Sequence, residues 1–169
     1  MFNLAICYDN GKGTEKNLEK AFHWYQKAAE NGDEEAMTSL AISYENGEGT
    51  EKNLEKAFHW YQKAVENREE GNAMFNLAIC YHSGKGTEKN LEKAFHLYQK
   101  AAEKGSERAM NDLTICYENG EGTEKNLEKA FYWHQKLAES TKVSSKDEGE
   151  LCNKCKKPHI EYPWHHQLD

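Results

Sequence analysis

The sequence lacks a long apolar run and a leader-like start. No stretch of apolar residues approaches the ~18 that cross a bilayer, and the first residues have neither the basic nor the apolar region of a signal peptide. Hydrophobic residues make up only 37% of the 169 residues. That share is low for a globular domain but normal for a helical solenoid, whose core is a thin strip between helices. We therefore expect no membrane partner.

Basic side chains are also in deficit. The 22 Lys and Arg residues stand against 29 Asp and Glu residues, which gives a net charge of −7. Nucleic acids and anionic membrane surfaces attract basic proteins, so this balance argues against both as partners. The expected partner is a protein or a peptide, and one with Lys or Arg side chains would associate faster at low salt.

Cysteine is scarce within the repeated part of the chain. Cys7, Cys80 and Cys116 occupy one position of a repeated unit, and Ser43 fills it in the remaining copy. Equivalent positions of stacked helices lie roughly 10 Å apart, which is too far for a disulfide. We interpret the three residues as small buried thiols. Without a signal peptide, they predict a reducing, cytoplasmic location.

The sequence does contain one segment in four copies. It reads Gly-Lys-Gly-Thr-Glu-Lys-Asn-Leu-Glu-Lys-Ala-Phe from Gly11 and returns almost unchanged from Gly47, Gly84 and Gly120. A constant period of ~20–50 residues is typical of stacked solenoids. Most residues of such a repeat contact the neighbouring repeats, so the surface that remains suits partner binding better than catalysis.

Each unit is predicted to fold as two helices, here named helix A and helix B. In the second unit Asp33 is a suitable N-cap of helix A and Gly47 a suitable left-handed end. Asn53 is the N-cap of helix B. The expected fold is all-α, a right-handed superhelix of four αα-hairpins with helix A on the concave side. The units span about 1–35, 36–72, 73–108 and 109–139.

These units resemble the Sel-one-like repeat, a relative of the tetratricopeptide repeat. The family pattern contains Leu-Gly, Tyr, Gly-x-Gly, Lys-Ala and Trp-Tyr-x-Lys-Ala-Ala. The second unit matches it at Ala36, Leu40, Tyr44, Gly47, Gly49, Lys56, Ala57, Trp60, Tyr61, Lys63 and Ala64. It departs from the pattern at Ala41 and Val65. The resemblance implies a scaffold, because members of this family are adaptors that gather partners in signalling, cell-wall synthesis or protein quality control.

Two positions of helix A change from unit to unit and lie seven residues apart, on one helical face. The first is occupied by Phe2, Thr38, Phe75 and Asn111, and the second by Asp9, Glu45, His82 and Glu118. Such variation marks either an unconstrained solvated surface or a groove that contacts a non-repetitive partner. We predict a partner-binding groove with an acidic rim. Phe75 is its expected anchor, since aromatic residues dominate interface hot spots.

The C-terminal part departs from the repeat. Residues 140–150 are polar and aperiodic, which predicts a linker. In the tail over 151–169, Cys152 and Cys155 form a C-x-x-C, the spacing of a zinc knuckle. Further nitrogen ligands are available from His159, His165 and His166.

Three interpretations of this tail stay open. Cys152 and Cys155 bind zinc together with His165 and His159, or they are an unmetalled remnant, or they form a redox pair. The redox pair lacks its usual βαβ context. The tail resembles the ribbon-like tails of some fungal Sel-one-like and kinase-linked proteins, in which a Trp and a second cysteine pair follow. Here Trp164 is present, but His165 stands at the place of the third cysteine.

Catalysis by the repeats is not expected. Some secreted bacterial members of the resembled family are linked to β-lactam binding or hydrolysis, but they carry two cysteines per repeat. This chain has at most one cysteine per repeat and no Ser-x-x-Lys arrangement. A further alternative is a non-catalytic interaction arm of a larger signalling protein, for example one linked to a kinase. Met1 coincides with Met37, inside helix A, so we expect the chain to begin in mid-array.

Overall fold

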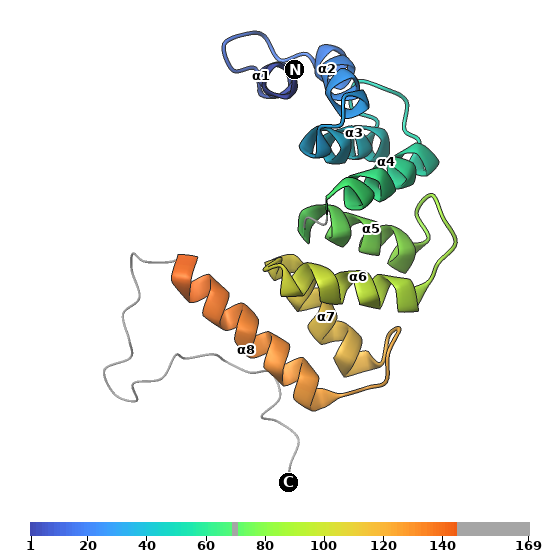
Figure 1. Cartoon of the computed structure of the whole chain (residues 1–169), viewed down its shortest axis with the longest axis vertical. Coiled ribbons are helices and arrows are strands. Elements are labelled where there is room, and N and C mark those ends of the chain that lie inside the picture. The colour runs from blue at the N-terminus through green and yellow to red at the C-terminus, as the bar shows by residue number, and fades with distance from the viewer. Residues whose placement is uncertain (69–70, 145–169) are drawn as a thin grey trace.

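The computed structural model describes residues 1–68 and 71–144. Over these residues the chain forms eight α-helices and no strand, stacked in order along the long axis of the molecule (Figure 1). They form four hairpins: α1 (Phe2–Asn10) with α2 (Leu18–Glu30), α3 (Glu34–Asn46) with α4 (Leu54–Asn67), α5 (Gly71–Ser83) with α6 (Leu91–Glu103), and α7 (Glu107–Asn119) with α8 (Leu127–Ser144). Odd-numbered helices are helix A and even-numbered ones helix B. The predicted all-α repeat solenoid is confirmed.

Local signals set the ends of these helices, as the sequence predicts. Asp33 accepts a hydrogen bond from the backbone N–H of Ala36 at the start of α3. Each helix B begins with an asparagine that accepts a 2.9 Å hydrogen bond from the N–H three residues later, and these caps are Asn17, Asn53, Asn90 and Asn126. Gly47 ends α3 with φ 77°, a conformation that glycine adopts without a Cβ clash.

In the second, third and fourth repeats, the second glycine of the Gly-x-Gly loop joins neighbouring repeats. A Cβ added at Gly49 would overlap the carbonyl oxygen of Leu18, at the start of α2, and the same overlap recurs at Gly86 and Gly122. A side chain at these positions would push successive repeats apart. The loop therefore ends helix A with its first glycine and contacts the preceding repeat with its second.

A stack of three side chains recurs at each joint between repeats. Phe58 of α4 meets the ring of Tyr81 in α5 edge-on, with centroids 5.3 Å apart and planes at 87°. Lys93 of α6 lies over the same ring, with Nζ 5.2 Å from its centroid. The pairs Phe22–Tyr44 and Phe95–Tyr117 repeat this geometry. Edge-to-face and cation–π contacts add to the free energy gained from burial alone.

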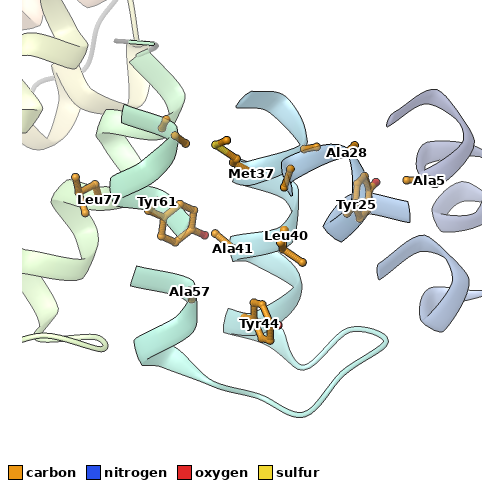
Figure 2. Close-up of a cluster of buried hydrophobic side chains, with 14 of the residues drawn as sticks. Ala5, Tyr25, Ala28, Met37, Leu40, Ala41, Tyr44, Ala57, Tyr61 and Leu77 are labelled. Carbon is orange, nitrogen blue, oxygen red and sulfur yellow. The ribbon is translucent and has the colours of Figure 1, made fainter. Parts of the chain in front are cut away.

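The core is a strip between successive helices. Its largest fully buried side chains are Leu40, Tyr61, Met74 and Leu113, and Figure 2 shows the first two, from α3 and α4, within the N-terminal part of this strip. At the far end, Phe131 of α8 is 56% exposed. It occupies the joint position of Phe95, but no fifth repeat lies beyond it among the described residues.

The last helix begins as predicted and ends later. α8 continues to Ser144, and Ser140 donates from Oγ to the carbonyl of Leu137 at 2.9 Å. Polar side chains here bond to the helix itself, so polarity alone was a poor sign of a linker. The linker prediction is wrong for residues 140–144, and residues 145–169 lie outside the described residues.

Two phenylalanines at the same position of helix B test the importance of the joint. We expect Phe95→Ala to lower the free energy of unfolding by ~3–4 kcal/mol, because Phe95 is only 7% exposed and contacts Tyr117. Phe131→Ala should cost less than ~1 kcal/mol, because Phe131 is mostly in solvent. Urea denaturation followed by circular dichroism measures both. Equal losses would contradict the joint described above.

Candidate functional site

The second variable position of helix A lies against helix B of the same repeat. Tyr25 donates from its hydroxyl to Asp9 Oδ2 at 3.0 Å, and Tyr61 donates to Glu45 Oε2 at 2.9 Å. Burial, together with the neighbouring carboxylates, raises the pKa of both tyrosines. The two phenols therefore stay protonated and keep donating at neutral pH.

The same position also reaches the Gly-x-Gly loop of the next repeat. Lys85, between the two glycines of the third loop, donates from Nζ to Glu45 Oε1 at 2.7 Å. One repeat further on, Nε2 of His82 lies 3.0 Å from Oε2 of Glu121 in the fourth loop. From one of these joints to the next, the acidic and the basic residue exchange places between helix A and the following loop. A polar contact is therefore kept across both joints.

These contacts set the ionisation of the two carboxylates. Burial opposes ionisation of Glu45, but the Lys85 ammonium and the Tyr61 hydroxyl outweigh it and hold the pKa of Glu45 below its ordinary value. The hydrogen bond with His82 holds the pKa of Glu121 below its ordinary value. Both groups are anionic at neutral pH. At these joints, contact between repeats is one cause of the variation that the sequence analysis assigned to a partner.

Phe75 is buried and is not a surface anchor. It is 4% exposed, its ring centroid lies 5.9 Å from that of Tyr98, and the guanidinium of Arg108 in α7 lies 4.4 Å from the same centroid. The prediction is wrong because an aromatic ring at this position contacts the tyrosine of its own helix B and is covered by the next repeat. Phe2 makes the same ring contact with Tyr25, at 5.8 Å.

The other predicted partner-binding residues lie closer to solvent. Asn111 is exposed, whereas Thr38 and Glu118 are half-buried. The structure thus divides the predicted set into a core residue, residues that contact helix B of their own repeat or the next repeat, and residues at the surface.

A cavity of about 300 Å³ lies between α5 and α7, and we call it the A-face cavity. Ile79 and Ile115 form its apolar walls, and its polar lining includes His82, Asp112 and Glu121. Ile115 is 40% exposed. The cavity therefore combines an accessible apolar surface with two carboxylates.

His82 was predicted to lie in the groove, whereas the two isoleucines were not predicted. A signal for Ile115 was present, because it follows Asn111 by four residues and precedes Glu118 by three. That spacing puts it on the same helical face as the variable positions. The isoleucines were not considered, and position alone does not tell which apolar residues the neighbouring repeats cover.

Two thiols of helices A are buried, Cys80 in α5 and Cys116 in α7, and Cys116 also lines this cavity. Burial raises the pKa of Cys80 and of Cys116 to about 12. Both thiols are protonated at neutral pH, and the thiolate is the reactive form of cysteine. They behave as small apolar groups, as the sequence predicts, whereas Cys7, the third predicted buried thiol, is half-buried.

The described part of the chain holds neither a cluster of metal ligands nor a membrane-spanning helix. Within residues 1–68 and 71–144, no group of three His, Cys, Asp or Glu side chains is placed to hold a metal ion. No helix in that part is long and apolar enough to cross a membrane. The proposed zinc ligands lie outside the described residues, and they are Cys152, Cys155, His159 and His165.

The Sel1 repeat family model matches residues 1–33, 34–68, 71–106 and 108–141. A solved Sel1 repeat protein from Oxalobacter formigenes is similar, with a TM-score of 0.75 and 39% identity over 81% of this chain and 56% of that chain. The c5321 protein, a protective antigen of uropathogenic Escherichia coli strains with an SLR fold, has a TM-score of 0.78. It is 31% identical over 82% of this chain and 29% of that chain.

A curated relative matches over a shorter stretch. The chitin synthase regulator SKT5 of Saccharomyces cerevisiae is 47% identical over 36 residues, which are 21% of this chain and 5% of that protein. The chain spans less than two thirds of the length of each of these three relatives.

The ion pair between repeats can be tested with two equivalent lysines. Lys85→Met removes the partner of Glu45 and should lower the free energy of unfolding at pH 7 by up to ~1 kcal/mol. Lys12→Met, at the same loop position of the first repeat, should change it by less than ~0.5 kcal/mol. The pKa of Glu45 is lowered on folding, so the pair stabilises fully above the unfolded pKa of ~4.3. Its contribution is lost as the pH falls through the folded value. Urea titrations at neutral and acid pH decide, and a Lys85→Met effect that persists in acid contradicts the assignment.

The zinc site of the tail stays a prediction with a direct test. Metal analysis of untagged protein should find close to one zinc per chain, because full structural sites contribute ~10–16 kcal/mol of binding free energy. Cys152→Ser should remove that zinc, whereas Ser140→Ala, at the end of the array, should not. Protein that contains almost no zinc, unchanged by Cys152→Ser, would exclude the site.

Proposed function

The chain belongs to the Sel1 repeat family, and we propose that it is a scaffold that binds a protein or peptide partner on the helix A face of the array. Sel1 repeats generally mediate protein–protein interactions. The A-face cavity is the observation that carries the proposal. It is open to a partner at Ile115, and its lining comes from α5 and α7 of two successive repeats.

A basic side chain of the partner fits this cavity. The aliphatic stem of a lysine or arginine would lie against Ile79 and Ile115, and its charge would meet the carboxylates of Asp112 and Glu121. The chain carries a net charge of −7, which attracts basic partners at longer range and speeds their association. The proposed partner is therefore a protein segment with an exposed lysine or arginine.

Binding rather than catalysis is proposed for the repeats. A general acid or base works best when its pKa lies near the operating pH. Here the pKa values are shifted away from neutral pH. Those of Glu45 and Glu121 are lowered, and those of Cys80 and Cys116 are raised to about 12. These shifts support structural and binding roles for the four groups.

A regulatory arm of a longer protein is the second candidate. It is favoured by the match to SKT5, a protein named as the regulator of an enzyme, in which the matched residues make up only 5% of the length. In both cases we propose a cytoplasmic location, because the buried Cys80 and Cys116 are free thiols and such thiols persist in a reducing compartment.

The test uses Asp112→Asn, which keeps the shape of the side chain and removes its charge. Partners captured from the source cells by the wild-type chain are identified, and the affinity of each is measured with both proteins. We expect Asp112→Asn to weaken binding roughly tenfold, a change of about 1.4 kcal/mol, and the loss to shrink at high salt.

Glu66→Gln is the matched control, because Glu66 is an exposed carboxylate on helix B of the second repeat. It should leave the affinity unchanged. Equal affinity of wild type and Asp112→Asn at low salt would contradict the proposed surface. A loss of affinity in Glu66→Gln would indicate that the partner binds the helix B side instead.

A further inference from the structure

One position of helix B holds tryptophan in three repeats and leucine in the third. The three tryptophans are Trp24, Trp60 and Trp133, and the leucine is Leu97. The histidine before this position and the lysine three residues after it are the same in the first three repeats. The third repeat therefore keeps the neighbours of the tryptophan and lacks the indole.

In the first two repeats, these neighbours surround the indole ring. Nζ of Lys27 lies 5.2 Å from the ring centroid of Trp24, and Nζ of Lys63 lies 5.0 Å from that of Trp60. The preceding histidine rings lie 5.7 and 5.9 Å from the two indoles. A half-buried indole between a histidine and a lysine is thus the standard arrangement of this position.

In the third repeat a cavity of about 280 Å³ opens beside Leu97, and we call it the indole pocket. Its lining includes His96 and Lys100, the equivalents of the residues that surround the indoles, together with Lys93. Leu77 and Tyr81 of α5 complete its apolar surface. It shares no lining residue with the A-face cavity.

We infer that the indole pocket binds a tryptophan side chain from an acidic segment of a partner protein. Leu77, Leu97 and Tyr81 offer an apolar surface to the ring. Lys100 holds the position from which Lys27 covers an indole in the first repeat. The ring of the partner would thus occupy the place of the tryptophan side chain that the third repeat lacks.

The charge around the pocket selects an acidic segment. The chain as a whole carries a net charge of −7, yet Lys93, His96 and Lys100 lie together along this pocket. Carboxylates beside the inserted tryptophan would lie close to these basic groups. An aliphatic side chain would gain burial but no cation–π contact with Lys100, so tryptophan is favoured over leucine.

Two labelled peptides test the inference with the full chain. The first is fluorescein-Asp-Glu-Trp-Glu-Asp, and the second has leucine in place of tryptophan. Fluorescence anisotropy should show saturable binding of the tryptophan peptide, at least tenfold tighter than that of the leucine peptide and weaker at high salt. Absence of saturable binding, or equal binding of the two peptides, would overturn the inference.

Leu97→Trp fills the pocket with the residue that the other repeats have there. The substitution should keep or raise the thermal midpoint of unfolding, and it should weaken binding of the tryptophan peptide at least tenfold. Wild-type affinity in a folded Leu97→Trp protein would overturn the inference.

A charge reversal provides a second variant with a matched control. Lys100→Glu should weaken binding of the tryptophan peptide at least tenfold. Lys27→Glu, at the same position of a repeat that has its own indole, should leave that binding unchanged. Equal effects of the two reversals would show attraction to the net charge alone and would overturn the inference. Asp112→Asn should leave peptide binding unchanged, so failure at the A-face cavity and failure at the indole pocket are separate results.

Discussion

The array depends on close contact between helix B of one repeat and helix A of the next. Two features make that contact possible. In the second, third and fourth repeats, the second glycine of the Gly-x-Gly loop has no side chain, so the loop touches the backbone at the start of the preceding helix B. A tyrosine such as Tyr81 is then held between Phe58 of the preceding repeat and Lys93 of its own. Because each repeat buries its apolar face only against its neighbours, this joint stabilises the whole fold and transmits damage along it.

The same joint places a constraint on the residues that vary. Glu45 contacts Lys85 across one joint, and His82 contacts Glu121 across the next. Where the residue on helix A changes from acidic to basic, its partner in the following loop changes from basic to acidic. Variation between repeats is usually attributed to a partner, but here part of it follows from neighbouring repeats that must match each other. A search for the binding surface therefore has to remove these matched pairs first. The residues that then remain are fewer, and among the carboxylates of the A-face cavity only Asp112 lies outside these matched pairs.

Both cavities arise where the third repeat differs from the others. His82 replaces an acidic residue next to the A-face cavity, and Leu97 replaces tryptophan at the indole pocket. Regular repeats fill the space between their helices with their own side chains. A departure from the repeat leaves a space that a partner can fill, and for this reason the third repeat is the proposed centre of binding.

The sequence alone determined the elements of this fold. The period, the Asp33 and Asn53 caps and the helix end at Gly47 could be predicted because they depend on residues only a few positions apart. Exposure could not be predicted in this way. Phe75 varies like a surface residue but is covered by α7, and Ile115 recurs like a core residue but stays accessible. Only the tertiary structure decided these points, because the burial of a side chain depends on the helices of neighbouring repeats, which lie about one repeat away along the chain.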